Sequence, residues 1–459
     1  MRYEMIVRTI IEKIFDTQIQ NIEKAVKLGL ESKQNQKKFY ILGTGHSHMM
    51  VEEFYDRLAG LDLFDSILMP ELMLHQFPGK STMIERLEGY AHIILAMYPI
   101  EKGDTLMLVS NSGRNGMMVE MAIQAKKLGA NIITLTNFEQ AKVVKSRHIS
   151  NTNIIDYGDV NIDNCGVYGD ACYTTKNGFK IGSTSSITTL LIAQLMNAMA
   201  YNSLGVSEDQ ESLISRFKAY YFNSFNRVSL ENTLDASQLL FETFINDQDI
   251  YIVGTGHSHL LTEEAYTRAG GFANIKAILE DEIMNHQGKG KSNEIESLSE
   301  YSQLILKKYG IKENDTIIIC SNSGSGAFSN ELAKRCQAMN VKVIAITNLR
   351  QNSTSKHQEG LLLKNTATIA IDNCCDENDA NFIVENKKCC PLSSSIGCYV
   401  LQGLLVNFAN VLEENDVVAP ILTSANVDMS DPSYQNHMNH NEIIKQKYKD
   451  KYIFQHKLS

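Results

Sequence analysis

The stretch Gly43-Thr-Gly-His-Ser-His48 decides the fold of this chain, because it returns letter for letter as Gly254-Thr-Gly-His-Ser-His259, 211 residues later. Further motifs recur at the same offset: Ser110-Asn-Ser-Gly113 as Ser321-Asn-Ser-Gly324, His75-Gln76 as His286-Gln287, and Thr136-Asn137 as Thr347-Asn348. Separated matches in a single register indicate an internal duplication. We therefore expect two tandem copies of one domain, residues 1–206 and 207–459, packed against each other because no low-complexity linker separates them.

The offset between the copies shrinks toward their ends. Asp163-Asn-Cys165 pairs with Asp372-Asn-Cys374, and Ser185-Ser-Ile187 pairs with Ser394-Ser-Ile396, both 209 residues later. The second copy has thus lost two residues, which we place in a surface loop because loops tolerate deletions.

Each copy alternates short apolar runs with stretches of helical spacing. The runs are 38–42, 104–109 and 131–135 in the first copy, and 249–253, 315–319 and 341–346 in the second. Continuous apolar runs that alternate with helices are typical of buried strands in a parallel sheet. Residues 1–34 and 208–247 fit amphipathic helices that lead into each sheet. The predicted fold is α/β, with two three-layer αβα sandwiches.

The composition is that of an ordinary globular protein. Hydrophobic residues make up 43% and charged residues 21% of the 459 positions, and we find no long uncharged apolar run that would predict a membrane span. Residues 2–12 carry charges in an amphipathic pattern rather than the apolar core of a signal peptide, so we expect a cytoplasmic protein. The net charge of −10 is spread without a basic stripe, which argues against a nucleic-acid partner.

The cysteines do not form a metal or disulfide pattern. Nine cysteines include the adjacent pairs Cys374-Cys375 and Cys389-Cys390, whereas structural zinc sites favour C-x2-C spacing. We expect free thiols in a reducing compartment and no cofactor. The H-x-H spacing of His46 and His48, with a third histidine and a glutamate nearby, leaves zinc as a minor alternative.

Ser110-Asn-Ser-Gly113 follows an apolar run directly and precedes the helical stretch 117–128. In an open α/β sheet, ligands bind at the carboxyl ends of strands, where a helix N-terminus offers unpaired N–H groups and partial positive charge. We therefore predict that Ser110, Asn111, Ser112 and the following Arg114 bind a phosphate. The alternative is that these residues only cap the helix.

The loop 43–48 supplies the other predicted ligand contacts, from Thr44, His46, Ser47 and His48. It lacks the G-x-G-x-x-G pattern of a dinucleotide site. Glu52 and Glu53 follow in the next helix, where one of them could remove a proton from a sugar carbon; we favour Glu53. His75 and Glu85 form the second candidate acid/base pair.

Hydroxyl groups also cluster where the last apolar helix of each copy begins, at Thr184-Ser185-Ser186 and at Ser393-Ser394-Ser395. Such clusters serve anions or helix caps equally well. The predicted counterparts of the site in the second copy are Thr255, His257, Ser258, His259, Glu264, His286, Ser321, Asn322, Ser323, Ser394 and Ser395.

With these motifs assembled, the chain resembles the sugar isomerase (SIS) family, and within it a group of uncharacterised single-domain phosphosugar isomerase-like proteins. The segments that carry the resemblance are GTGHSH, LMLHQ at 72–76, ERLEGYA at 85–91, SNSGRN at 110–115, IDNCGVYGDA at 162–171 and, once only, SANVD at 424–428. The resemblance implies a five-stranded parallel sheet flanked by helices in each copy, a sugar phosphate bound through the SNSG loop, and an internal pseudo-dimer.

The two copies depart from this pattern to different degrees. The second copy has Ser325 where the first has Arg114, and an acidic run, 375–380, where the first has 166–171. It nevertheless keeps Tyr266-Thr-Arg-Ala-Gly-Gly271 closer to the pattern of the group than the first copy keeps 55–60. We expect one good site, centred on the phosphate loop of the first copy and completed by residues of the second, and one weakened site.

The expected function is that of an aldose–ketose isomerase acting on a sugar phosphate. A non-catalytic phosphosugar sensor and an etherase-type lyase of amino-sugar phosphates are the alternatives. Beyond the sugar phosphate and the internal pairing of domains, further homo-oligomerisation is open, and neither nucleic acid nor a membrane is an expected partner.

Overall fold

The computed structural model describes residues 2–57, 59–74, 79–205, 209–288, 290–424 and 434–449. In the first copy the chain forms, in order, α1 (Tyr3–Thr17), α2 (Ile19–Gln34), β1 (Phe39–Gly43), α3 (His48–Phe54), β2 (Asp65–Ser66), α4 (Lys80–Ile84), α5 (Tyr90–Met97), β3 (Thr105–Val109), α6 (Gly116–Lys127), β4 (Asn131–Thr136), α7 (Phe138–Ala141), β5 (Val160–Asp163), β6 (Ala171–Thr174), β7 (Lys180–Ser183) and α8 (Ser185–Leu204).

The second copy repeats this order. It forms α9 (Gln210–Arg227), α10 (Leu234–Ile245), β8 (Ile250–Gly254), α11 (His259–Ala265), β9 (Ile275–Ala277), α12 (Lys291–Glu296), α13 (Tyr301–Tyr309), β10 (Thr316–Cys320), α14 (Ala327–Ala338), β11 (Lys342–Thr347), α15 (Leu363–Thr366), β12 (Ile369–Asp372), β13 (Phe382–Val384), β14 (Lys387–Cys389) and α16 (Ser393–Glu414), and α17 (Tyr434–Lys447) follows. The predicted boundary at residue 206 lies outside the described residues and stays a prediction.

Each copy holds a five-stranded sheet in which every pairing is parallel. The strand orders are β2-β1-β3-β4-β5 and β9-β8-β10-β11-β12, and all six apolar runs of the sequence form strands within them. The two antiparallel hairpins, β6-β7 and β13-β14, stand outside the sheets. The predicted α/β class and the two sandwiches are therefore confirmed.

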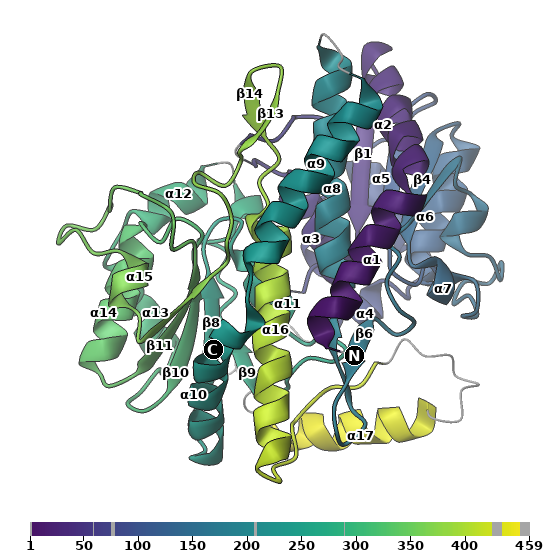
Figure 1. Ribbon diagram of the computed structural model, residues 1–459. Helices are drawn as coiled ribbons and strands as arrows, with labels where there is room; N and C mark the ends of the chain where they lie inside the picture. Colours follow the sequence, from purple (N-terminus) through teal and green to yellow (C-terminus); the bar gives the residue numbers. More distant parts are fainter. Residues whose placement is uncertain are drawn as a thin grey trace.

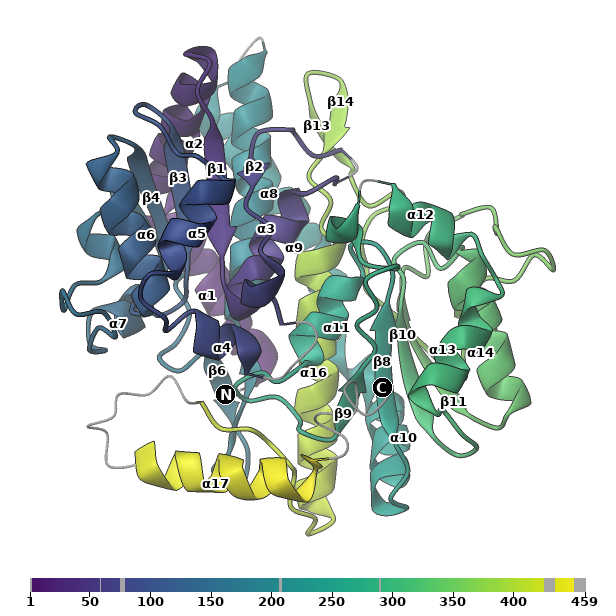
Figure 2. The same cartoon turned by 180° about the vertical axis from the view of Figure 1, so that it is seen from behind.

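The two sheets share their inner helical layers (Figures 1 and 2). One hydrophobic core runs through both copies and includes buried residues of α8 and α16, which pack against each other. Separate cores cover the outer faces, with α5 and α6 on the first sheet and α13 and α14 on the second. The copies therefore form one packed body, as an internal pseudo-dimer does.

Helix α16 corrects the expectation that the chain has no long apolar run. By length and composition it could cross a membrane, but 83% of its apolar window is buried inside the protein. Its hydrophobicity is explained by its place between the copies, where polar side chains would have to find partners.

The register of the last helix is also corrected. Asp170 accepts hydrogen bonds from the N–H and hydroxyl of Ser185, and Asp379 accepts the same pair from Ser393. Ser185 therefore corresponds to Ser393, one residue earlier than the sequence match suggested. The extra residue is lost in the hairpin, where β13-β14 is shorter than β6-β7.

Candidate functional site

A cavity of about 450 Å³ opens at the carboxyl ends of β1 and β3 in the first copy. From the first copy it is lined by the loops after these strands, by the residues around α4, and by Asp170 and Ser185. From beyond the first copy come Thr267, Arg268 and Ala269 of the loop after α11, and Leu422, Thr423, Met438, Asn441 and Lys445 of the C-terminal segment. The cavity is therefore lined by residues of both copies.

The loop after β3 presents polar groups beside the start of α6. The Ser110 hydroxyl accepts the Gly113 N–H at 3.2 Å, and Asn111 accepts a hydrogen bond from Asn164 at 2.8 Å. Gly113 has φ +65°, and a Cβ there would lie 2.2 Å from the Asn153 Oδ1, so only glycine fits. The Ser112 hydroxyl bonds to no other described residue and lines the cavity, where an anion could use it.

The loop after β1 orients a carboxyl group in the cavity. The Thr44 hydroxyl donates to Glu85 Oε2 at 2.8 Å, and both residues line the cavity. Burial raises the pKa of Glu85, although the Thr44 hydrogen bond and the charges of nearby arginines oppose the shift. A carboxyl group with a raised pKa in a cleft is suited to proton transfer.

His46 presents a neutral imidazole to the same cavity. Its Nε2 lies 3.1 Å from the carbonyl oxygens of Glu263 and Tyr266, so this nitrogen donates to the second copy. Burial lowers the pKa of His46 to about 3, helped by the charge of Arg268. The second ring nitrogen, Nδ1, is then the one that accepts hydrogen bonds.

Arg268 lines the cavity and was not among the site residues predicted from the sequence. Its guanidinium, only 2% exposed, pairs with Asp170 at 2.9 Å and donates to the hydroxyls of Ser185 and Ser186. The arrangement is reciprocal, since Arg57 of the first copy pairs with Asp379 at 3.1 Å and donates to Ser393. Residues 266–271 match the pattern of the related proteins well, which could have pointed to Arg268. Its partners on the other copy could not be inferred from sequence spacing.

Several predicted residues do not reach the cavity. The described residues that line it include neither Glu53, which accepts from Gln194 at 2.6 Å, nor the buried Arg114. Of the three hydroxyl residues at the start of α8, Ser185 alone lines it, whereas Thr184 and Ser186 bond to Asp170 and Arg268. His75 and Ala425–Asp428 lie outside the described residues.

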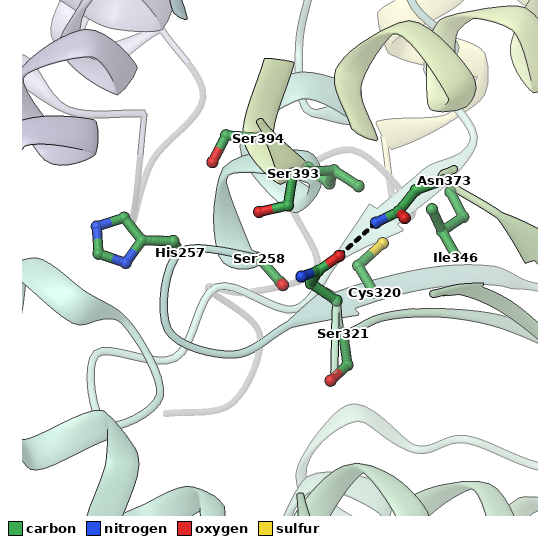
Figure 3. Close-up of a pocket in the computed structure, with 10 residues that line it drawn as sticks. His257, Ser258, Cys320, Ser321, Ile346, Asn373, Ser393 and Ser394 are labelled. Atoms are coloured by element: carbon green, nitrogen blue, oxygen red, sulfur yellow. Dashed lines mark hydrogen bonds between the residues drawn. The ribbon is translucent and has the colours of Figure 1, made fainter. Parts of the chain in front are cut away.

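The corresponding pocket of the second copy is nearly closed, with about 10 Å³ of space (Figure 3). It keeps His257, Ser258, Ser321, Asn322 and Ser394, and the Asn373 amide donates to Asn322. Thr255 still donates to Glu296, as Thr44 does to Glu85.

Two further serine side chains of the second copy form hydrogen bonds away from the second pocket. The Ser325 hydroxyl, which replaces Arg114, donates to that of Ser323 at 3.0 Å. Ser395 bonds to Tyr221 and to the Ile187 carbonyl, because the register shift turns it into the core. None of these serines is among the described residues that line the small second pocket.

A buried cluster of acids and imidazoles lies between α3 and α11, apart from both pockets. Glu52 is contacted by His48 at 2.8 Å, by His259 at 2.6 Å and by His286 at 3.0 Å. Burial would raise the pKa of Glu52, but His286 and the three hydrogen bonds hold it well below its usual value. His48, His259 and His286 were predicted to contact substrate; the structure places them in this cluster instead.

Glu264 likewise lies in the interface between the copies. It pairs with Arg268 at 2.8 Å and accepts from Gln402 at 2.7 Å, as Glu53 does with Arg57 and Gln194. Burial raises the pKa of both glutamates. These three-residue contacts each lie within one copy and recur in the other.

The chain resembles known proteins in both sequence and fold. It is 41% identical over 188 residues to a UPF0309 protein of Halalkalibacterium halodurans, covering 41% of this chain and 78% of the relative. A UPF0309 protein of Caldanaerobacter subterraneus is 42% identical over 191 residues, covering 41% and 77%.

Solved structures resemble it more distantly. The C-terminal domain of glucosamine-fructose-6-phosphate aminotransferase from Francisella tularensis aligns with a TM-score of 0.47 at 12% identity, over 90% of this chain and 98% of that one. Glucosamine-6-phosphate deaminase from Thermotoga maritima gives 0.42 at 10%, over 90% and 96%.

A family model described as the SIS domain matches residues 2–137 and again 219–348. Both matched ranges contain a GTGHSH loop and an SNSG loop, and together they span more than half of the chain. This chain therefore belongs to the SIS domain family and carries two SIS domains in tandem.

Proposed function

We propose that this chain binds a sugar phosphate in the cavity of its first copy and interconverts the aldose and ketose forms. The observation that carries the proposal is that Glu85, a carboxyl group with a raised pKa, lines the same cavity as the Ser110–Ser112 loop. An anion-binding loop and a proton-transfer group are the two parts that such a reaction needs.

The size and charge of the cavity suit this substrate class. Its volume of about 450 Å³ matches the range of small-molecule sites. Arg86, Arg268 and Lys445 line it, so cationic side chains are present for a phosphate. The Ser112 hydroxyl and the N-terminal end of α6 supply the hydrogen bonds that hold the phosphate in place.

The chemistry follows from the position of Glu85. Its carboxylate removes a proton from the sugar carbon next to the carbonyl, which gives an enediolate, and returns this proton to the former carbonyl carbon, while the hydroxyl proton passes to the former carbonyl oxygen. His46 Nδ1 accepts a hydrogen bond from a sugar hydroxyl and thereby orients the substrate. The isomerisation moves protons only, so these residues suffice without a redox group.

A panel of sugar phosphates and their unphosphorylated counterparts, screened by thermal shift on the whole chain, tests the binding step. A ligand that binds the native state raises Tm by linkage. We expect stabilisation by one or more sugar phosphates only. If no phosphorylated sugar raises Tm, the proposal is refuted.

Glu85→Gln separates an isomerase from a sensor. We expect kcat to fall by about 10²–10⁴-fold, the usual contribution of a general base, while the thermal shift is kept. Glu296→Gln, the same change in the nearly closed second site, is the matched control and should leave kcat unchanged. If the parent chain shows no turnover and both variants keep the thermal shift with sugar phosphates, the protein is a sensor instead.

A further inference from the structure

The cluster around Glu52 has the composition of a metal site. Glu52 Oε2, His259 Nε2 and His286 Nδ1 all lie within 4.8 Å of one another, and each residue is buried. Glu52 comes from the first copy and both histidines from the second. A fourth donor atom, Glu263 Oε1, lies 3.3 Å from His259 Nε2.

Two histidines and a glutamate form a ligand set that suits zinc. Donors on a tetrahedral zinc are about 3.3 Å apart, because Zn–N and Zn–O bonds are about 2.0–2.2 Å long. The Glu52 oxygen now lies 2.6 Å from His259 and 3.0 Å from His286. A few tenths of an ångström of side-chain movement would therefore admit the ion.

The outer contacts of the histidines support this role. His259 Nδ1 hydrogen-bonds to the carbonyl of Gly256, which orients Nε2 toward Glu52. Metal-ligating histidines characteristically donate their second ring N–H to an acceptor, as His259 does here. The Gln287 side-chain nitrogen lies 3.2 Å from His286 Nε2, so this amide has to turn its oxygen toward Nε2–H when Nδ1 binds the ion.

Charge balance points in the same direction. The side chains of Glu52 and Glu263 are each only 1% exposed, and burying carboxylates is costly without compensating charge. One divalent cation held by neutral imidazoles would compensate both, in place of the imidazole charge that does so in its absence. It would also join residues of the two copies at the centre of their interface.

We propose that Glu52, His259 and His286 bind one zinc ion, with Glu263 placed to complete the coordination, and that the ion fastens the two SIS domains to each other. None of these four residues is among the described residues that line the cavity, although the Glu263 carbonyl accepts a hydrogen bond from His46, and the proposal does not rest on the isomerase activity. It also differs from the zinc arrangement that the sequence suggested, which was centred on His46, His48 and His75.

Metal analysis of the purified whole chain, before and after dialysis against a chelator, tests the proposal. We expect one zinc per chain, a lower Tm after chelation, and recovery of Tm when Zn²⁺ alone is added back. Cobalt substitution should give the visible absorption of four-coordinate nitrogen and oxygen ligands. No stoichiometric metal in the native chain, and no Tm response to Zn²⁺, would overturn the proposal.

Variants locate the ion. Glu52→Gln and His286→Asn should each lose the zinc, whereas Glu53→Gln, the same change at the neighbouring buried glutamate, should keep it. If the first two variants do not fold, the cobalt spectrum of the parent protein decides, because thiolate absorption would place the ion on cysteines and overturn the assignment. Stabilisation by phosphorylated sugars reports the cavity separately.

Discussion

At the scale of single residues, the decisive pair is Thr44 and Glu85. The hydroxyl of Thr44 stabilises the charged form of Glu85, while burial of the carboxyl group opposes it and dominates. The base form exists only above the pKa of Glu85, which lies above the usual value for glutamate. Activity is therefore lost as pH falls through this raised pKa.

Thr44→Val tests that relation. The change removes the hydrogen bond that lowers the pKa of Glu85, so the acid limb of the kcat/KM profile should move to higher pH. Thr255→Val, which removes the equivalent bond to Glu296, should leave the profile unchanged. An unshifted acid limb in Thr44→Val would show that Glu85 is not the titrating base.

Ser112→Ala tests the phosphate loop. A hydrogen bond to a charged group contributes about 1.5–3 kcal/mol, so affinity for the sugar phosphate should fall roughly 10- to 150-fold. Isothermal titration measures the loss, and Tm without ligand serves as the control, since the hydroxyl has no partner among the described residues. Equal affinity in the variant would exclude this serine from binding.

At the scale of elements, the loops after α3 and α11 exchange arginines between the copies. Arg268 and Arg57 make matching ion pairs, and Arg268 lines the cavity of about 450 Å³. The geometry of a guanidinium is not reproduced by an ammonium group. The two arginines thus make equivalent ion pairs, and we propose that they differ in ligand binding.

Arg268→Lys and Arg57→Lys distinguish the two roles. Both should lower Tm, because each weakens a buried ion pair. Only Arg268→Lys should also weaken sugar phosphate binding, by about tenfold, the equivalent of roughly 1.4 kcal/mol. Equal ligand affinity in the two variants would contradict the assignment of Arg268 to the cavity.

The C-terminal helix α17 is the other element that completes the cavity. Asn441 exchanges hydrogen bonds of 2.8 Å with the backbone of Thr423, and the buried Ile444 packs against Ala273 and Leu422. Both figures show α17 lying beneath the first copy, although it follows the second in sequence (Figures 1 and 2). The helix therefore joins the second copy to the site of the first.

Ile444→Ala should loosen α17 without unfolding the sheets. Truncating a buried isoleucine to alanine costs about 2–5 kcal/mol. Here the loss weakens the packing of α17 against the rest of the protein. We expect faster proteolysis within the C-terminal segment and weaker sugar phosphate binding, with an unchanged main unfolding transition. Unaltered proteolysis and binding would show that the helix does not close the site.

At the scale of the whole molecule, much of the fold was predictable. The duplicated motifs gave the two copies, and the apolar runs gave six of the ten sheet strands. Thr44, His46, Ser47, Glu85 and the Ser110–Ser112 loop, which were chosen from the sequence, line one cavity, and their roles stay predictions.

What the sequence could not supply is the effect of packing one copy on the other. His48 and Glu53 follow the same loop as the cavity residues, but both are buried: the His48 ring packs against His286 of the second copy, and Glu53 pairs with Arg57 of its own copy. Arg268 and α17 reach the first site across the interface for the same reason. Contacts between the copies do not produce a periodic pattern in the sequence of either copy.

The asymmetry of the two sites is the central claim, and binding stoichiometry tests it most directly. Titration of the whole chain with the sugar phosphate found by thermal shift should give one site per chain. That site should be weakened by Ser112→Ala and unaffected by Ser323→Ala. Two sites of equal affinity per chain would contradict the account.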